Sequence, residues 1–160
     1  QMCIRDSAYT MLAYWNDEAA TATAIDDDFW LDTGDIGRLE DGVLTIDSRA
    51  RDMILHNGEN VYPIEVEYRI EDHPDVAEVA VYGIDDELSG QIVAAAVVAV
   101  PGASLDVDDL RDWTAVSLAP YKVPTVWEIR ADTLPRNAAG KVVKDALRGT
   151  RDHDIDPLSD

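Results

Sequence analysis

The sequence predicts an α+β protein: a small C-terminal domain, made of a three-stranded sheet with flanking helices, preceded by a β-rich segment. Three observations indicate this class. Apolar runs with the character of strands alternate with helical patterns from residue 76 onward. Asp41-Gly42 separates two short alternating runs, which is a strong hairpin signal. Finally, 46% of the 160 residues are hydrophobic, which suffices for a sizeable core.

Residues 1–47 contain too little regular structure to close a core of their own. A short apolar stretch at 8–14 suits a strand, and Asn16 can cap a helix over 17–24, ahead of the predicted hairpin. Since one helix and three short strands need further partners, we expect these residues to form the C-terminal edge of a larger domain. Residues 1–7 match nothing that follows, so whether they are native sequence stays open.

A polar, charge-dense stretch at 48–52 follows, without apolar periodicity. We interpret it as a hinge linker between two domains. Beyond it, residues 53–55 and 60–62 can pair across a turn in which Asn57 and Gly58 tolerate a positive φ.

The second predicted domain covers residues 53–149. Pro63 stands where a proline opens a helix well, and the helical pattern continues to Asp72. The other expected elements are strands at 76–83, 91–100 and 125–131, helices at 107–117 and 142–148, and a tight loop at 137–140. Residues 150–160 carry four aspartates and predict a disordered acidic tail.

The charge of the chain excludes broad binding to polyanions. There are 33 acidic and 13 basic side chains, and the net charge of -20 should repel nucleic-acid backbones and anionic membranes. Residues 122–151 are the exception, because seven basic and three acidic side chains fall there. This segment holds all three lysines: Lys122, Lys141 and Lys144. It indicates either a site for a discrete anion or a solvated basic helix end.

Metal and disulfide chemistry find little support. Cys3 is the only cysteine, and the three histidines are scattered along the chain, so neither a disulfide framework nor a metal-ligand cluster is predicted. The longest apolar run, at 92–100, is far shorter than the roughly 20 residues of a membrane span. With no export signal at its start, the chain is expected to be cytoplasmic.

Two features with chemical potential lie near the predicted hinge. Asp35 ends an aromatic stretch at a Thr-Gly turn, and its two carboxylate oxygens can accept hydrogen bonds from vicinal hydroxyls such as those of a ribose. A plain surface turn is the alternative. Arg49 and Arg51 can contact an anion or exchange partners between two domain arrangements, or they are simply solvated.

Two further features are glycine turns in the second domain. Gly58 would let a ligand pass close to the backbone, although a simple hairpin also explains it. Lys141 follows the glycine turn of the 137–140 loop, where a mobile ammonium can neutralise phosphate charge. The loop is only loosely similar to a phosphate loop, because the glycine spacing and the hydroxyl residue after the lysine are missing.

In this order and spacing, the features resemble the adenylate-forming superfamily of acyl-CoA synthetases, aryl-CoA ligases, luciferases and peptide-synthetase adenylation domains. The match runs from about Met11 to Leu147 but covers only the last third or so of such an enzyme. It is carried by Trp30 through Thr33-Gly34-Asp35-Ile36-Gly37, Arg49-Ala50-Arg51-Asp52, Gly58-Glu59-Asn60-Val61-Tyr62-Pro63, Ala119-Pro120-Tyr121-Lys122-Val123-Pro124, and Leu134-Pro135-Arg136-Asn137 with Gly140-Lys141.

The resemblance implies roles in adenylation for three residues. Asp35 is similar to the carboxylate that holds the ribose hydroxyls of ATP, and Arg49 to the arginine that contacts the same nucleotide. Lys141 is similar to the catalytic lysine that stabilises the charge between the substrate carboxylate and the α-phosphate, together with Mg²⁺. No Mg²⁺ ligand is expected in this chain.

The resemblance also implies a second half-reaction with CoA. Family members rotate the C-terminal domain about a hinge, whose position here is Arg51. The Gly58 loop then lines the channel for the pantetheine of CoA, while Tyr121 can stack on the CoA nucleotide and Lys122 can meet a phosphate. Tyr121 as a half-buried packing residue is the alternative.

Some family features are absent. Ser48 and Asn57 replace usual glycines, Ser89 stands where some relatives have a tryptophan that stacks on CoA, and the phosphate-binding loop and acyl pocket have no counterpart. We therefore interpret the chain as a fragment of an ATP-dependent acyl-CoA synthetase for a fatty or related acid, inactive without the N-terminal domain. A peptide-synthetase adenylation domain and a non-catalytic interaction module remain alternatives.

Overall fold

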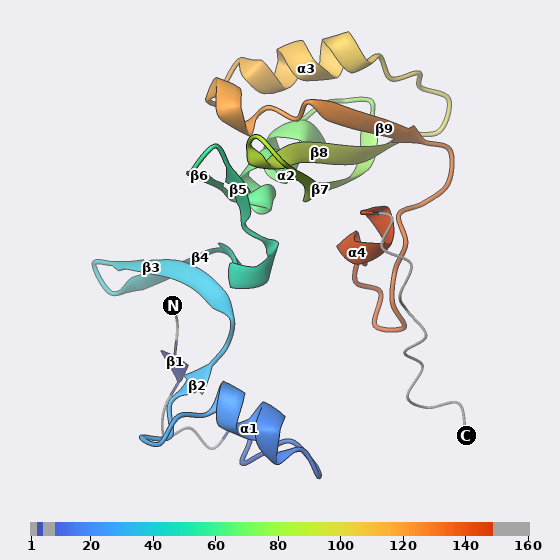
Figure 1. Cartoon of the computed structure of the whole chain (residues 1–160). Coiled ribbons are helices and arrows are strands. Elements are labelled where there is room, and N and C mark those ends of the chain that lie inside the picture. The colour runs from blue at the N-terminus through green and yellow to red at the C-terminus, as the bar shows by residue number, and fades with distance from the viewer. Residues whose placement is uncertain (1–2, 5–8, 149–160) are drawn as a thin grey trace. The chain divides into compact units, whose positions relative to one another are not determined.

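The computed structural model describes residues 3–4 and 9–148 (Figure 1). The chain divides into two compact units, Gln1–Met53 and Ile54–Asp160. The proposed acidic tail at 150–160 and most of the stretch 1–7 lie outside the described residues.

The described residues of the N-terminal unit form one α-helix, a short 3₁₀ helix and two small antiparallel sheets. Its elements are β1 (Cys3–Ile4), α1 (Glu18–Ala24), β2 (Leu31–Asp32), β3 (Asp35–Glu40) and β4 (Val43–Arg49). Strand β1 pairs with β2, and β3 pairs with β4. The Asp41-Gly42 hairpin is confirmed, and both residues have positive φ angles, 50° and 81°. Ser48 is the only described side chain of this unit that is buried.

Two predictions for this unit were wrong in detail. Residues 9–14 contain no strand, and only Tyr14 forms an isolated bridge, to Asp17. A short apolar stretch becomes a strand only where another strand offers hydrogen bonds, and here the described residues offer that single bridge. The cap of α1 is Asp17 instead of Asn16: its carboxylate accepts the N–H of Ala20 at 2.8 Å.

The stretch 48–52, predicted to be a hinge linker, has regular local structure. Ser48 and Arg49 extend β4, because they lie opposite Ile36 and Asp35 of β3. The chain then forms a short 3₁₀ helix at Ala50–Asp52. The sequence of this stretch lacks apolar periodicity, so it gave no sign of this strand end, which pairs with β3.

The C-terminal unit is built on a five-stranded sheet, so the α+β class is confirmed while the expected three strands were too few. The strands are β5 (Ile54–His56), β6 (Glu59–Val61), β7 (Val76–Asp86), β8 (Gly90–Ala99) and β9 (Val126–Arg130). Strand β8 is central: it pairs along its length with antiparallel β7, and on its other side with β5 and with parallel β9. The Asn57-Gly58 hairpin supplies the two extra strands.

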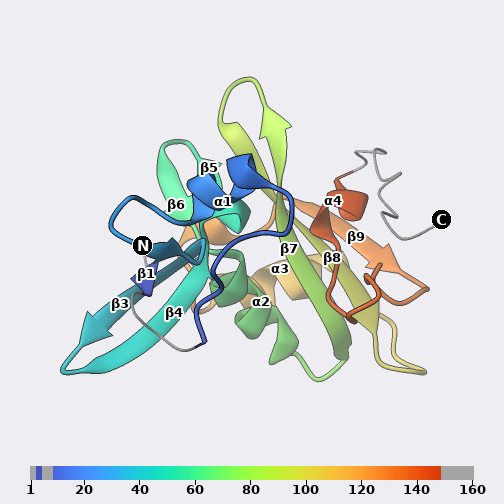
Figure 2. The ribbon, with the colours of Figure 1, turned by 90° about the horizontal axis from the view of Figure 1, so that it is seen from below.

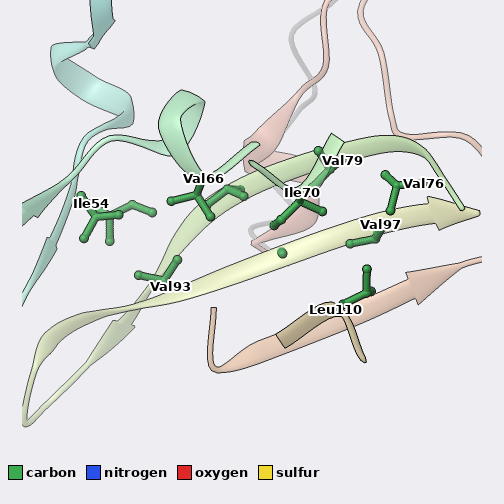
Figure 3. Close-up of a cluster of buried hydrophobic side chains, with 11 residues drawn as sticks. Ile54, Val66, Ile70, Val76, Val79, Val93, Val97 and Leu110 are labelled. Carbon is green, nitrogen blue, oxygen red and sulfur yellow. The ribbon is translucent and has the colours of Figure 1, made fainter. Parts of the chain in front are cut away.

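Helices cover both faces of this sheet. On one face, α2 (Pro63–Glu71) and α3 (Val107–Ala115) pack their buried side chains, among them Val66, Ile70 and Leu110, against the strands (Figure 3). Pro63 opens α2 as predicted. On the other face, the short α4 (Lys144–Leu147) lies beside the sheet (Figure 2). Buried Leu134 packs there against the alanine-rich side of β7 and β8. Helix α4 is shorter than the predicted 142–148.

Candidate functional site

In the N-terminal unit, Asp35 and Arg49 face each other across the β3–β4 pair. Their register places them opposite, and Nε of Arg49 lies 3.4 Å from Oδ1 of Asp35. The backbone at Asp35 is held by the preceding turn, since the N–H of Asp35 donates to the hydroxyl of Thr33 at 3.3 Å. The side chain of Asp35 is 23% exposed and that of Arg49 is 50% exposed. Two predicted nucleotide contacts are thus adjacent and accessible.

A shallow, open hollow of about 320 Å³ lies beside this pair, within the same unit. Its walls include Thr33, Gly34, Arg49 and Arg51. Gly34 has a φ of 68° and its carbonyl accepts the N–H of Ala50 at 2.8 Å, so the turn before β3 is tied to the 3₁₀ helix. The hollow therefore brings the predicted hinge residue Arg51 next to a predicted nucleotide contact. Arg51 is itself 80% exposed, with Asp52 as its neighbour at 3.7 Å.

In the C-terminal unit, Gly58 lies at the tip of the β5–β6 hairpin. Asn57 and Gly58 have φ angles of 52° and 82°, as the tight turn requires. No heavy atom lies within 4 Å of the position that a Cβ of Gly58 would take. The turn thus explains the glycine locally, and the space beside it is open to a ligand.

This hairpin is fastened to the turn between β7 and β8. The N–H of Asn57 donates to the carbonyl of Ser89 at 2.8 Å, and Nδ1 of His56 lies 2.6 Å from the carbonyl oxygen of Gln91. Asp86 braces the turn, because its carboxylate accepts the hydroxyl of Ser89 at 2.6 Å. Hydrogen bonds from Ser89 hold the pKa of Asp86 below its ordinary value. These hydrogen bonds therefore fix the position of the Gly58 turn relative to the turn between β7 and β8.

Tyr121 and Lys122 lie in a second 3₁₀ helix, Pro120–Lys122, and the ammonium of Lys122 is 5.9 Å from the centre of the Tyr121 ring. The ammonium is not free. It lies 2.7 Å from both carboxylate oxygens of Glu65 at the start of α2, and the Lys122 side chain is only 19% exposed. A phosphate would have to compete with Glu65, which sequence reasoning did not anticipate.

Lys141 ends a loop that is clamped by one side chain. Oδ1 of Asn137 accepts the N–H groups of Ala139 at 3.1 Å and of Lys141 at 3.0 Å, and Gly140 has a φ of 77°. The predicted tight loop is confirmed. The side chain of Lys141 is exposed and has no hydrogen bond or ion pair with any other described residue. The Lys141 ammonium is therefore available to a ligand, while the backbone that carries it is held by hydrogen bonds to Asn137.

The basic segment 122–151 is not one cationic surface. Among its described residues, most cations are paired with a carboxylate: Lys122 with Glu65, Arg130 with Glu128, Arg136 with Glu78, Lys144 with Glu67 and Arg148 with Asp145. Of the three lysines, only Lys141 is left without a partner among the described residues. The partners Glu65 and Glu67 were missed because they are 57 and 77 residues away along the chain, and local patterns carry no signal for such pairs.

The predicted site residues do not form a single constellation within a unit. Asp35, Arg49 and Arg51 cluster in the N-terminal unit. In the C-terminal unit, the Gly58 hairpin and the Lys141 loop lie on different parts of the sheet, as Figures 1 and 2 both show. The described residues hold no group of three side chains suited to a metal ion.

Comparison with known proteins assigns the family. Residues 65–141 match the family described as AMP-binding enzyme C-terminal domain. These residues belong to the family of AMP-binding enzyme C-terminal domains. An indoleacetate–CoA ligase of Aromatoleum aromaticum is 43% identical over 139 residues, which are 86% of this chain and 27% of the ligase. A long-chain-fatty-acid–CoA ligase of Bacillus subtilis is 39% identical over 148 residues, 91% of this chain and 26% of the ligase.

Solved structures agree with this assignment. An o-succinylbenzoate CoA synthetase of Bacillus subtilis, in complex with an acyl-adenylate intermediate, superposes with a TM-score of 0.80 at 36% identity, covering 87% of this chain and 28% of the synthetase. The chain spans about a quarter of the length of the relatives that it matches. Within the described residues, no helix is long and apolar enough to cross a membrane.

Proposed function

We propose that this chain is the C-terminal part of an ATP-dependent acid–thiol ligase. The enzyme would activate a carboxylic acid as acyl-AMP and then transfer the acyl group to CoA. The observation that carries this proposal is Lys141: an exposed ammonium, without a partner among the described residues, on a loop whose backbone is clamped by Asn137. Family membership supports it, as do the names of the relatives, which are CoA ligases.

In the first half-reaction, an oxygen of the substrate carboxylate attacks the α-phosphorus of ATP and pyrophosphate leaves. Negative charge gathers around the phosphorus, and the ammonium of Lys141 stabilises it. Asp35 accepts hydrogen bonds from the ribose hydroxyls, while Arg49, whose Nε lies 3.4 Å from Oδ1 of Asp35, contacts the nucleotide. Mg²⁺ would enter with ATP and supplies further charge neutralisation at the phosphates.

In the second half-reaction, the thiol of CoA attacks the acyl carbonyl and AMP leaves. A rotation about Arg51 would exchange the Lys141 loop for the Gly58 hairpin beside the acyl-adenylate. Three observations support a ligand path at Gly58: no atom lies within 4 Å of its Cβ position, the turn is exposed, and the hairpin is held by the hydrogen bond from Asn57 to Ser89. Tyr121 would stack on the CoA nucleotide, and Lys122 would bind a phosphate only by leaving Glu65.

Substitution of Lys141 in the longer enzyme that carries this chain tests the first role. We expect Lys141→Ala to abolish acyl-AMP formation while sparing acyl transfer from supplied acyl-AMP, because the lysine acts only on the phosphoryl step. Arg111→Ala removes an exposed cation of α3 as the control. An unchanged rate of acyl-AMP formation in Lys141→Ala would refute the role of Lys141 in adenylation.

A matched pair of glycine variants tests the second role. Gly58 and Gly102 have similar φ angles, 82° and 89°, and both have open space where a Cβ would lie. Gly58→Val should slow thioester formation more than adenylation, whereas Gly102→Val, which carries the same backbone strain, should alter neither selectively. Equal loss in both half-reactions for Gly58→Val would reject the channel role.

The acid and the acceptor need a direct screen. We propose a fatty or related carboxylic acid as substrate, because one relative is named as a ligase of long-chain fatty acids and another as a ligase of indoleacetate. Pyrophosphate release with a panel of fatty and aromatic acids identifies the acid. Supplying CoA or a carrier protein then separates a CoA ligase from a peptide-synthetase-type enzyme, and no release with any acid would favour an interaction module.

A further inference from the structure

The segment that carries Lys141 is fastened to the rest of its unit on both sides of the loop. From this geometry we infer that two ion pairs, Arg136–Glu78 and Lys144–Glu67, position Lys141 for adenylation and act as a tether of the loop. The inference rests on the proposed function, because it concerns the same lysine. None of the four residues is proposed to touch substrate; they are positioning residues.

The upstream attachment joins strand β7 to the glycine turn itself. Nη2 of Arg136 lies 2.6 Å from Oε2 of Glu78 on β7, and the Glu78 side chain is 23% exposed. Nη1 of the same guanidinium donates to the carbonyl of Gly140 at 2.9 Å. One planar group therefore fixes the residue before Lys141 relative to the sheet. Buried Leu134 holds the start of the segment on the same sheet.

The downstream attachment reaches across the free edge of β7 to helix α2. Nζ of Lys144 lies 2.8 Å from Oε1 of Glu67, and these side chains are only 19% and 17% exposed. The same oxygen of Glu67 accepts the N–H of Val81 at 2.8 Å, on the side of β7 that faces away from β8. The carboxylate thus joins α2, β7 and the segment after Lys141 at one point.

A third contact continues along that edge. Nε of Arg148 donates to the carbonyl of Gly83 at 3.2 Å. Together with Glu67, it covers edge groups of β7 that no described strand pairs. Ion pairs lie on either side of the loop, beside the apolar packing of Leu134 and Val142, so the tether depends on charge as well as on packing.

Loss of Lys144 should loosen the loop through electrostatics. Glu67 would keep a half-buried charge without its cation, and a carboxylate lies nearby: the pKa of Glu71 is raised by burial first and then by repulsion from Glu67. A buried charge without a partner moves toward water, and the segment attached to it moves too. Small misplacement of a catalytic group far from the mutated atom can cost about 100-fold in rate.

The test compares half-reactions in the longer enzyme with Lys144→Met and Glu67→Gln. The glutamine keeps an oxygen for the N–H of Val81, so it removes only the charge. We expect acyl-AMP formation to fall by about tenfold in either variant, with acyl transfer from supplied acyl-AMP within about twofold of wild type. Because the two residues form one contact, the double variant should be no worse than the single ones, and Lys144→Arg should recover most of the rate.

Two controls keep the inference open to refutation. Arg111→Met removes an ion pair with Asp108 on α3, which packs on the opposite face of the sheet from α4, and should leave adenylation intact. Hydrogen exchange on the 160-residue chain gives a readout without catalysis: in Lys144→Met, exchange of the amides of Ala139 and Lys141 should rise about fivefold, while amides of β8 stay unchanged. A melting curve shows whether each variant folds.

The outcomes separate the tether from the proposed function. Adenylation within about twofold of wild type in Lys144→Met, equal loss in both half-reactions, or unchanged exchange at the loop would each overturn the positioning role. If Lys141→Ala instead leaves adenylation intact, the proposed function fails, and the exchange experiment alone still decides whether the ion pairs hold the loop.

Discussion

Replacing Asn137 with alanine should loosen the Lys141 loop without disturbing the sheet. The side-chain oxygen of Asn137 accepts the N–H groups of Ala139 and Lys141 at 3.1 Å and 3.0 Å. Alanine removes this acceptor and nothing else of size. Two backbone contacts stay, since the N–H of Asn137 donates to the carbonyl of Lys141 and the N–H of Gly140 donates to that of Asn137, both at 2.9 Å.

The magnitude follows from the number and the exposure of the lost bonds. A net hydrogen bond contributes about 0.5–1.5 kcal/mol, so two bonds set an upper range of about 1–3 kcal/mol. All the groups involved are exposed, and water replaces the lost acceptor, so we expect about 1 kcal/mol for the loop. This corresponds to about a fivefold increase in the open fraction of the loop.

Amide hydrogen exchange of the 160-residue chain measures this directly. In Asn137→Ala, the amides of Ala139 and Lys141 should exchange about fivefold faster, and amides of β8 should not change. Asn137→Asp is the matched control, because its carboxylate keeps the acceptor and should preserve protection at both amides. Unchanged exchange in Asn137→Ala, or equally fast exchange in Asn137→Asp, would refute the argument that this oxygen shapes the loop.

Three further predictions concern stability. Leu110→Ala should lower the free energy of unfolding by about 2–5 kcal/mol because Leu110 is fully buried between α3 and the sheet, whereas exposed Val116→Ala should change it by less than about 0.5 kcal/mol in chemical denaturation. Gly140→Ala should lower the free energy of unfolding by about 1–2 kcal/mol, because alanine is strained at a φ of 77° although no atom lies within 4 Å of its Cβ position. A smaller loss in chemical denaturation would mean that the backbone of the turn relaxes. Ser89 holds the pKa of Asp86 below its ordinary value of 3.8, so the Asp86 carboxylate stabilises the fold above that value and loses this contribution as pH falls through its folded-state pKa. The difference in unfolding free energy between wild type and Asp86→Asn should therefore be constant from neutral pH to about pH 5 and should close below about pH 4. A difference that does not change with pH would contradict the assignment.

Local signals predicted the turns well. Asp41-Gly42 and Asn57-Gly58 both form hairpins, because a tight turn with two positive φ angles leaves few residue types to choose from. Pro63 opens α2 for a similarly local reason, its pre-set φ. These positions depend on the backbone of a few residues, so sequence alone is enough.

Strand partners could not be predicted in the same way. The apolar runs that form β7, β8 and β9 were located, but nothing in them specifies that β9 lies parallel to β8 or that β5 joins at the other end of that edge. The pairing brings together residues far apart in the chain, and many arrangements bury the same apolar area. The number of strands in the sheet was wrong for this reason.

The candidate site shows the same division. Motif spacing singled out Lys141, Asp35 and Arg49, and the structure adds that Asp35 and Arg49 are direct neighbours. It also corrects the reading of charge: the basic segment is mostly neutralised by carboxylates from α2 and β7. Counting charges along the chain cannot reveal this, because a charge is cancelled by its neighbours in space.

By itself, the sequence determined the α+β class, the turns and the lysine on which the proposed chemistry depends, because these follow from local backbone preferences and from residue spacing. Only the tertiary structure decided which cations are available. It pairs Lys122 with Glu65 and Lys144 with Glu67, and it leaves Lys141 exposed on a clamped loop between two ion pairs. The reason is physical: an ammonium is neutralised by whichever carboxylate the fold brings within about 4 Å, whatever their separation along the chain.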